Sequence, residues 1–352
     1  MLDCANILLT KISIWVQVRD DTMRALYYTG TMQSELRNAP DPVAANDQIH
    51  LDISHCGICG SDMHAWHGHD ERRVPPLILG HEAVGVPRNG KYAGKRVAIN
   101  PMHTCGDCRH CLCGDDHLCP NRQLMSMQLP GAYAEQSVAA ERNLYPLSDV
   151  ISNEDAALAE PLAVCVHAVE VARKTARRPF AEGRCVVLGG GAIGVLTALV
   201  LADQGCKDLW IAEPNAHRRD VLEKACPGRT YDPATDGPAE GSADIVLDAV
   251  GMGATRKAAS ALAVPGGTIV HIGLQDSTEG LNTRRITLQE IHFSGSYCYT
   301  RYDFAAALKL LTNGIVKNRD WIEVRPLEEG AQSFMDIHEG KAPPKIILSM
   351  GA

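Results

Sequence analysis

The sequence lacks any apolar run of about 18 residues, which is the length that a membrane-spanning helix requires. It also lacks an excess of positive charge, because its formal net charge is -8. That balance argues against nucleic acid or an anionic membrane as the main partner. Residues 1–22 show no convincing export signal, since Lys11 interrupts their short apolar run and no small-residue cleavage site follows. We therefore expect a protein that does not bind membranes.

Cysteine, by contrast, is abundant, with thirteen residues in 352. An odd number of cysteines with close CxxC spacings is more typical of metal binding than of a disulfide framework. This favours a reducing, cytoplasmic setting. A chain of this length has room for two domains.

The pattern along the chain changes twice. Residues 1–22 match nothing downstream, and we expect a disordered extension or an artefact of start-site choice, with the first strand beginning near Met23. Short β-runs broken by Gly, Pro and Asp follow up to about residue 150. A helix is predicted over 153–174, with Asn153 as its cap. The predicted strands of the first part include 48–53, 83–86 and 96–99.

From about residue 184, apolar strands alternate with helices rich in Ala and Leu, which predicts a buried parallel sheet. The chain then ends with a predicted helix at 302–312 and a strand at 345–350. The four predicted parallel strands are 184–188, 209–212, 245–249 and 268–272.

Four cysteines form the most specific local motif, in the spacing C-x2-C-x2-C-x7-C. Four thiolates on one small lobe predict a closed, structural zinc site with no position for substrate. Cys113 breaks the spacing, and we interpret it as a bystander. The four predicted ligands are Cys105, Cys108, Cys111 and Cys119.

A second group combines Cys59 with His81 and Glu82. Thiolate, imidazole and carboxylate together suit zinc, and a catalytic zinc keeps one position open. Cys56 and Cys59 also form a CxxC that could be a redox pair, but a thioredoxin-like pair needs a βαβ setting directly around it. The His- and Gly-rich surroundings favour metal.

A glycine-rich turn follows the predicted strand at 184–188 and opens a helix, which is the pattern of a dinucleotide-binding fingerprint. Gly189 allows the tight turn, Gly191 lets the backbone approach a pyrophosphate, and Gly194 lets the helix pack on the strand. Glu213, about twenty residues on, would accept from both ribose hydroxyls and repel a 2′-phosphate, which favours NAD over NADP. Arg218 lies close enough to blur that choice. The predicted cofactor-binding residues of this region are Gly189, Gly191, Ala192, Ile193, Gly194, Glu213 and Arg218.

From Met23 to near its end, the chain resembles the zinc-containing medium-chain dehydrogenases, which act on alcohols, polyols and threonine. The resemblance rests on Cys59-Gly-Ser-Asp, Gly80-His-Glu, the four-cysteine lobe, Glu160-Pro-Leu and the glycine turn. Glu160-Pro-Leu is closer to the polyol and threonine branch than to the ethanol branch. The extension at 1–22 has no counterpart in the family pattern.

The resemblance implies an α/β fold, with a GroES-like, β-rich catalytic domain at 23–160 and 298–352. A Rossmann domain would occupy 161–297. It also implies that Cys59, not Cys56, is the metal ligand, and that Glu160 supplies or exchanges with a fourth position. Ser61 and His64 match the family's proton relay, Asp62 would orient a ligand, and Lys345 matches a basic position that can reach the pyrophosphate.

The activity that follows from the resemblance is oxidation of a secondary alcohol of a polyol or sugar-like substrate to a ketone. Hydride would pass to NAD, with two zinc ions in each subunit and a homo-oligomer, dimer or tetramer, as the assembly. Oxidation of an amino alcohol such as threonine is the alternative. A zinc-free quinone or enone reductase would lack the Cys59 ligand set, whereas a dinucleotide-binding protein without turnover stays open.

Overall fold

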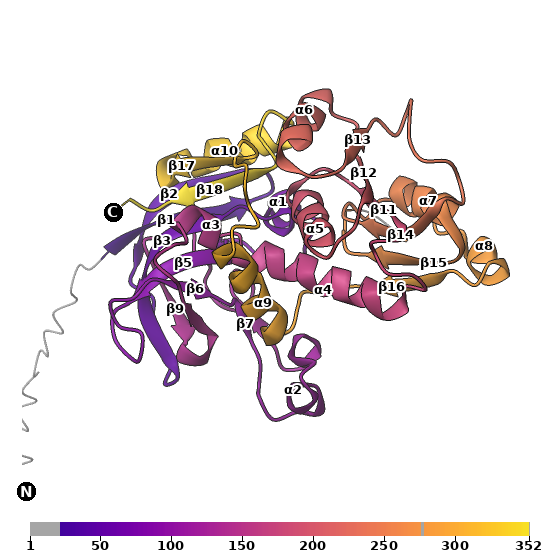
Figure 1. The fold of residues 1–352 in the computed structure, drawn as a ribbon. Helices are drawn as coiled ribbons and strands as arrows, with labels where there is room; N and C mark the ends of the chain where they lie inside the picture. Colours follow the sequence, from indigo (N-terminus) through magenta and orange to yellow (C-terminus); the bar gives the residue numbers. More distant parts are fainter. Residues whose placement is uncertain (1–21, 276–277, 352) are drawn as a thin grey trace, which may run out of the picture.

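The computed structural model describes residues 22–275 and 278–351, so the predicted extension lies almost wholly outside them. β1 begins at Thr22, close to the predicted start at Met23. None of the helices in these ranges is both long and apolar enough to cross a membrane. Figure 1 shows a β-rich half that contains both ends of the described chain, and a second half built from the middle of the sequence.

The β-rich half is built on a seven-stranded sheet with β3 (Gln48–Gly57) near its centre. β3 pairs antiparallel with β5 (Glu82–Pro87), with β9 (Gln136–Ala140) and with β18 (Lys345–Ser349). The last strand of the chain therefore returns beside one of the first, as the resemblance implied. β10 (Leu144–Pro146), β6 (Val97–Ile99) and β17 (Ile322–Pro326) complete this sheet.

Smaller elements surround that sheet and carry the site loops. Three strands form a sheet in the order β2 (Gln33–Pro40), β1 (Thr22–Gly30) and β4 (Leu77–Ile78), and β7 (Met102–His103) pairs with β8 (Gln123–Leu124). The helices of this half are α1 (Gly60–Trp66), α2 (Arg109–Cys113), α3 (Asn153–Ala156), α9 (Arg301–Thr312) and α10 (Gly330–His338). Single turns of 3-10 helix lie at Asp116–Leu118, Glu141–Asn143 and Leu327–Glu329.

The second half contains a six-stranded parallel sheet in the order β13-β12-β11-β14-β15-β16. Numbered along the chain, this is the 3-2-1-4-5-6 order of a dinucleotide-binding sheet. The four predicted strands are confirmed, although the last of them, predicted over 268–272, begins five residues earlier at Ala263. The strands are β11 (Arg184–Leu188), β12 (Asp208–Ala212), β13 (Arg229–Tyr231), β14 (Ala243–Asp248), β15 (Ala263–His271) and β16 (His292–Gly295).

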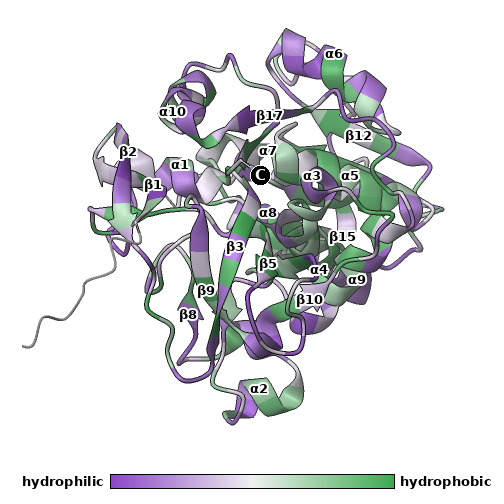
Figure 2. Cartoon of the chain, turned by 90° about the vertical axis from the view of Figure 1, so that its left-hand side faces the viewer, coloured by the Kyte–Doolittle hydropathy of each residue, from purple (hydrophilic) through white to green (hydrophobic). Residues whose placement is uncertain are grey.

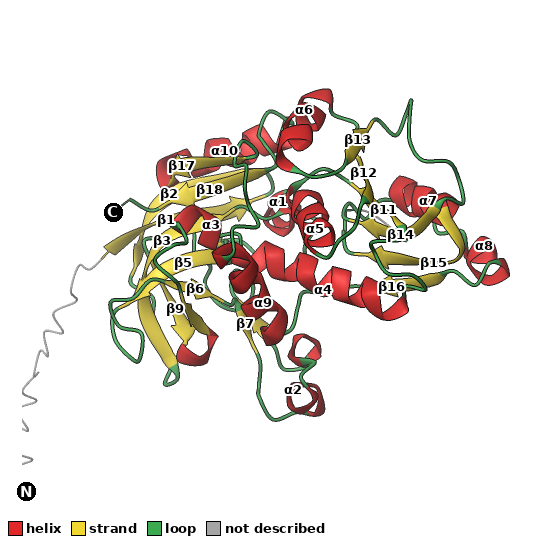
Figure 3. Ribbon diagram, in the orientation of Figure 1, coloured by secondary structure: helices red, strands yellow, loops and turns green. Residues whose placement is uncertain are grey.

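Helices cover both faces of this sheet, as Figure 3 shows. α5 (Ala192–Asp203) is apolar on nearly all sides, in green in Figure 2, and is buried along most of its length. A helix that is apolar all round needs neighbours on several sides, and α5 has them in β11, β12 and α4 (Ala159–Thr175). The outer helices are α6 (Ala216–Ala225), α7 (Gly253–Leu262) and α8 (Thr283–Leu288).

The predicted helix over 153–174 is two helices, α3 and α4 (Ala159–Thr175). Its predicted cap was wrong, because the side chain of Ser152 accepts from the backbone N–H of Asp155 at 3.2 Å and Asn153 is the first helical residue. α4 packs on α5 and on α9, so it joins the two halves. The predicted domain boundary at 160/161 falls inside α4, and the division of the chain stays a prediction.

Candidate active site

The three predicted catalytic ligands come from two neighbouring elements. Cys59 is the N-cap of α1, and its Sγ accepts from the backbone N–H of Ser61 at 3.5 Å. His81 lies immediately before β5 and Glu82 is the first residue of that strand, which pairs with β3 so that Gly57 faces Glu82. One ligand atom from each of Cys59, His81 and Glu82 lies within 4.8 Å of the other two. Cys56 is buried outside this group, with its Sγ 3.8 Å from the carbonyl oxygen of Gly57.

The ring of His81 is held from one side. Its Nδ1 lies 3.4 Å from Oδ1 of Asp62 and 3.2 Å from the hydroxyl of Ser126. With Nδ1 engaged, Nε2 is left for a metal, which is the arrangement that outer partners of ligating histidines produce. The donor set of soft sulfur, imidazole and carboxylate therefore fits zinc.

Asp62, which supports this ring, is completely buried. It accepts a hydrogen bond of 2.7 Å from the hydroxyl of Tyr133 and one of 3.2 Å from the N–H of Cys59. Burial alone would raise its pKa, but His81, Arg73 and Tyr133 hold the pKa of Asp62 well below the usual range. Asp62 therefore stays ionised and favours a proton on Nδ1 of His81.

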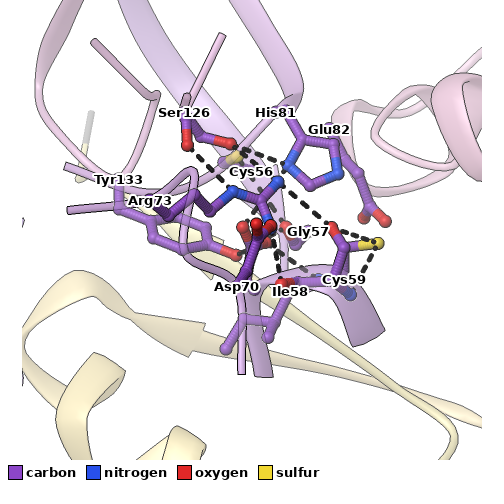
Figure 4. Close-up of polar contacts among 12 residues, drawn as sticks. Cys56, Gly57, Ile58, Cys59, Asp70, Arg73, His81, Glu82, Ser126 and Tyr133 are labelled. Carbon is purple, nitrogen blue, oxygen red and sulfur yellow. Dashed lines mark hydrogen bonds and ion pairs between the residues drawn. The ribbon is translucent and has the colours of Figure 1, made fainter. Parts of the chain in front are cut away.

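Arg73 was missed by the sequence reasoning, and it lies at the centre of the network in Figure 4. Only 5% exposed, it donates to the carbonyl oxygens of Ser61 at 2.6 Å and of Ser126 at 3.0 Å. Its Nη2 also lies 3.3 Å from the hydroxyl of Ser61. It therefore links Ser61, two residues after the ligand Cys59, to Ser126, which contacts His81. No local sequence motif predicts these contacts, because Arg73 and Ser126 lie in irregular segments.

The two predicted relay residues are not joined by a hydrogen bond in the described structure. The hydroxyl of Ser61 lies 3.5 Å from Sγ of Cys59, whereas the ring of His64 stacks edge-on with His69 at 5.4 Å between centroids. Burial and His69 lower the pKa of His64. The structure thus places Ser61 beside a ligand and leaves the relay through His64 as a prediction.

Glu160, the predicted fourth ligand, is buried at the start of α4 and lies outside the three-residue group. Burial, opposed by the nearby His81, raises the pKa of Glu160 to about 7. It is close enough to interact with Glu82 and with the hydroxyl of Tyr299. An approach to the metal would require a shift of this side chain.

Lys345 has a different setting from the one the resemblance implied. Its ammonium is buried, donates to the carbonyl oxygen of Ile58 at 2.9 Å and contacts the carboxylate of Glu82. The pairing of β18 with β3 produces this position. Contact with a pyrophosphate would require the amine to leave Glu82. In this structure Lys345 instead lies beside the predicted ligand Glu82.

The four cysteines of the second motif converge on a lobe around α2. Their Sγ atoms all lie within 4.8 Å of one another, with separations of 3.4 Å for Cys105 and Cys119 and 3.5 Å for Cys108 and Cys111. A tetrahedral zinc with Zn–S bonds of about 2.3 Å places sulfurs about 3.8 Å apart, so this cluster fits one. Cys113 is exposed and lies outside the group.

The glycine turn leaves β11 and enters α5. Gly189 has a φ of +102°, and a Cβ on Gly194 would lie 1.8 Å from the carbonyl oxygen of Gly189, so neither position accepts a side chain. A Cβ on Gly191 would meet nothing within 4 Å. Open space at the N-terminus of a helix is a cradle for phosphates, so the turn fits a dinucleotide. Ala192 and Ile193 begin α5 directly behind it.

Glu213 follows β12 and lies next to this turn. Its carboxylate accepts from the N–H of Gly190 at 3.0 Å and from the N–H of Asn215 at 2.9 Å. Arg218 lies in the first turn of α6, and its Nε is buried without a hydrogen-bond partner among the described residues. Arg219, which the sequence reasoning missed, donates to the carbonyl oxygen of Glu213 at 2.8 Å.

Comparisons with known proteins agree with this geometry. Residues 45–149 match the alcohol dehydrogenase GroES-like domain, and residues 192–313 match the zinc-binding dehydrogenase family. The protein named "Probable diacetyl reductase [(R)-acetoin forming] 2" of Saccharomyces cerevisiae is 30% identical, over 93% of this chain and 90% of its own length. The chain belongs to the zinc-binding alcohol dehydrogenase family. The predicted α/β fold, the resemblance and the enzyme class, a zinc- and nicotinamide-dependent dehydrogenase, are therefore confirmed.

Two further matches have lower sequence identity. A 2-dehydro-3-deoxy-L-galactonate 5-dehydrogenase of Pseudoalteromonas atlantica is 28% identical, over 87% of this chain and 92% of its own length. The solved structure of the alcohol dehydrogenase TADH from Thermus sp. ATN1 superposes with a TM-score of 0.84 at 23% identity. It covers 94% of this chain and all of its own, and at that identity it supports the fold alone.

Proposed function

We propose that this chain oxidises a secondary alcohol of a polyol or sugar-like substrate to a ketone and transfers the hydride to NAD. The observation that carries the proposal is the convergence of Cys59, His81 and Glu82 beside the Ser61 hydroxyl. Two of the relatives described above support it, since their names concern a sugar acid and acetoin, which both react at a secondary alcohol or its ketone.

The roles of the residues follow from their positions. Zinc held by Cys59, His81 and Glu82 would polarise the substrate oxygen and lower the pKa of the alcohol. Ser61 would accept the hydroxyl proton and pass it through His64 to solvent. Bound NAD would supply the hydride acceptor for the carbon that carries this hydroxyl. The alcohol thus loses one hydride and one proton, and the product is the ketone.

The dinucleotide would be held by the turn at Gly189–Gly194, with its pyrophosphate against the open N-terminus of α5. Glu213, already an acceptor, would receive the ribose hydroxyls and disfavour a 2′-phosphate, which favours NAD. Arg218 would favour NADP instead, because its buried Nε has no hydrogen-bond partner among the described residues and would suit a 2′-phosphate. The cofactor side of the site lies at the carboxyl ends of the parallel strands.

The division of the chain that we propose assigns 23–160 and 298–352 to the zinc-binding half and 161–297 to the dinucleotide-binding half. Sheet membership supports it, since β18 pairs with β3 while β11 to β16 form one parallel sheet.

A homo-oligomer, dimer or tetramer, is proposed as the assembly. β16 leaves an unpaired edge in the described sheet, and edges of this kind pair with copies. Light scattering after size exclusion tests it, and a monomer would refute it.

A cytoplasmic setting is the remaining part of the proposal. It rests on the twelve described cysteines, which form no disulfide with one another. Cell fractionation checks this part, and recovery of the protein in an exported, disulfide-bonded form would refute it.

The decisive experiment follows NADH absorbance when zinc-loaded protein meets NAD and a panel of polyols, diols, polyhydroxy acids and threonine. Turnover of a polyol or sugar derivative with loss of activity in Cys59→Ser is the expected result. Turnover of threonine alone would favour the amino-alcohol alternative. Tight binding of NAD without turnover of any substrate would favour a dinucleotide-binding protein instead.

A further inference from the structure

A short segment lies close to the predicted ligand Glu160. It runs from β16 to α9 and contains Tyr297, Cys298 and Tyr299. Tyr299 is buried and its hydroxyl interacts with the carboxyl of Glu160, whereas Tyr297 is only partly buried. Groups that contact Tyr297 therefore touch a side chain two residues along the chain from one that reaches Glu160.

Arg122 is the main contact of Tyr297. Its guanidinium lies over the tyrosine ring at 4.8 Å, and its Nε donates to the tyrosine hydroxyl at 3.2 Å. Its Nη1 donates to the carbonyl oxygen of Cys119, at 2.8 Å. These contacts fix the plane of the guanidinium, but none of them is with a carboxylate. In the ranges that the structure describes, no ion pair is recorded for this half-buried cation.

Two further guanidiniums, those of Arg72 and Arg73, share a single carboxylate. Arg72 makes a bidentate pair with Asp70 at 2.8 and 3.0 Å, and Arg73 shares the same carboxylate at 3.5 Å. Arg72 also lies within electrostatic range of Tyr297 and Cys298. Arg72 and Arg73 thus share one aspartate, whereas the recorded contacts of Arg122 in the described ranges include no carboxylate. An anionic group on a substrate would supply the carboxylate or phosphate partner that these contacts of Arg122 lack.

Cys298 shows that this cationic group and the ligands share one region. Burial and Glu160 raise the pKa of Cys298 to about 11, while His81 and Arg122 both lower it in part. The thiol is therefore within electrostatic range of both the predicted ligand Glu160 and the guanidinium of Arg122. A substrate of several carbons could react at one end and contact Arg122 with the other.

We propose that the substrate carries an anionic group, a carboxylate or a phosphate monoester, which Arg122 binds while Arg72 adds to the positive potential. This inference rests on the proposed dehydrogenase function and names the substrate class for the same site. Arginine is suited to the task, since its planar fork donates to two oxygens of such a group at once. The contacts with Tyr297 and Cys119 hold that fork in place before the substrate arrives.

The test compares substrates that differ only in charge. One pair is an aldonic acid and the alditol of the same configuration, and the other is a polyol and its terminal phosphate monoester. The values of kcat/KM with NAD are measured for zinc-loaded wild type, Arg122→Gln, Arg122→Lys and Arg72→Gln. Arg173→Gln is the matched control, because Arg173 is as exposed as Arg72, has one carboxylate partner and lies on α4 away from the site.

The anionic member of at least one pair should be preferred, and which pair shows the preference distinguishes carboxylate from phosphate. Arg122→Gln should lower kcat/KM for the anion by roughly ten- to a hundredfold, the size expected for a lost charge-assisted hydrogen bond. That loss should appear mainly in KM and leave the neutral member nearly unchanged. Arg122→Lys should recover part of it, Arg72→Gln should give a smaller loss, and added salt should raise KM for the anion only.

Two results would overturn the inference. One is equal or better use of the neutral members in both pairs. The other is an equal loss for neutral and anionic substrates in Arg122→Gln, which would mean that Arg122 only supports Tyr297 and the cysteine lobe. Calorimetric binding of the anions to the protein–NADH complex is a second readout that needs no turnover, and wild-type affinity in Arg122→Gln would refute the inference there. Failure of all substrates to react would refute the proposed function, whereas neutral turnover without preference refutes only this inference.

Discussion

Nη2 of Arg73 lies 3.3 Å from the hydroxyl oxygen of Ser61, the group that we expect to take the substrate proton. A guanidinium can only donate, so this contact occupies one lone pair and directs the hydroxyl hydrogen elsewhere. Sγ of Cys59, at 3.5 Å, is the acceptor available on the ligand side. Arg73 therefore sets the orientation of the Ser61 hydroxyl. It also contacts the hydroxyl of Ser126, which in turn contacts Nδ1 of His81.

Arg73→Lys should keep the charge but lose the simultaneous contacts with Ser61 and Ser126. We expect kcat to fall by roughly ten- to a hundredfold, because the hydroxyl and the His81 ring lose their common support, each worth about 1–3 kcal/mol. The pH profile of kcat should also change shape, which a purely structural role would not cause. Arg173→Lys is the control. An unchanged pH profile with a lowered melting temperature would show that Arg73 only stabilises the fold.

The sequence predicted the parallel strands and the glycine turn well, because these depend on local patterns of apolar residues and glycines. Donor chemistry indicated the ligands Cys59, His81 and Glu82, and the resemblance selected Cys59 over Cys56. The structure brings the three together. Arg73 and Lys345 could not be placed in the same way. Their partners are 53 and 263 residues distant along the chain, so their roles depend on which strands and loops pair. The cap at Ser152 was missed because Asn153 has the same capping chemistry one position later.

Substitution by alanine should affect two glycines of the same turn differently, with a loss of stability at one and a loss of NAD binding at the other. Gly194→Ala should destabilise the fold by roughly 1–3 kcal/mol or more, since its Cβ would overlap the carbonyl oxygen of Gly189. Gly191→Ala should keep the wild-type melting temperature, because its Cβ enters open space, but should weaken NAD binding. Thermal unfolding and fluorescence titration with NADH measure the two effects. Wild-type affinity in Gly191→Ala would place the pyrophosphate elsewhere.

Two zinc ions per chain are expected, one in each ligand group. Cys105→Ser should remove one zinc and lower the melting temperature, because a structural zinc contributes to the free energy of folding. It should also raise KM, since Arg122 is held by the carbonyl oxygen of Cys119. Cys59→Ser should remove the other zinc and abolish turnover while NAD binding survives. Cys113→Ser, an exposed cysteine outside both groups, is the control. Metal analysis that gives one zinc or none in wild type would contradict this.

Glu213 should set the preference for NAD through charge as well as hydrogen bonding. Glu213→Gln keeps an acceptor oxygen but removes the repulsion of a 2′-phosphate, so use of NADP should improve while use of NAD falls only modestly. Glu213→Ala should lose both contributions, so its preference for NAD over NADP should become smaller still. The ratio of kcat/KM for the two cofactors is the measurement. A wild-type enzyme that uses NADP as well as NAD would show that Arg218 outweighs Glu213.

The relay is the last expectation, and it separates Ser61 from His64. Burial and His69 lower the pKa of His64, so the imidazole is neutral at pH 7 and able to accept a proton. The acid limb of the kcat profile should then lie below the ordinary histidine value of about 6.5. It should disappear in His64→Ala. General acid–base assistance is typically worth about 10²- to 10⁴-fold, and water can partly replace a terminal group. His64→Ala should therefore cost less than that, and its deficit should shrink as pH rises.

Ser61→Ala should cost more than His64→Ala, because it removes the group nearest to the ligands. His67→Ala is the matched control, since His67 lies one turn further on and bonds to His338 at 3.0 Å instead. No hydrogen bond joins Ser61 to His64 in the described structure, so the relay requires a rotation of the imidazole or a bridging water. If His64→Ala matches wild type at every pH while Ser61→Ala is impaired, the proton leaves by another path. Arg73 would not be that path, because its guanidinium has no acceptor for a proton.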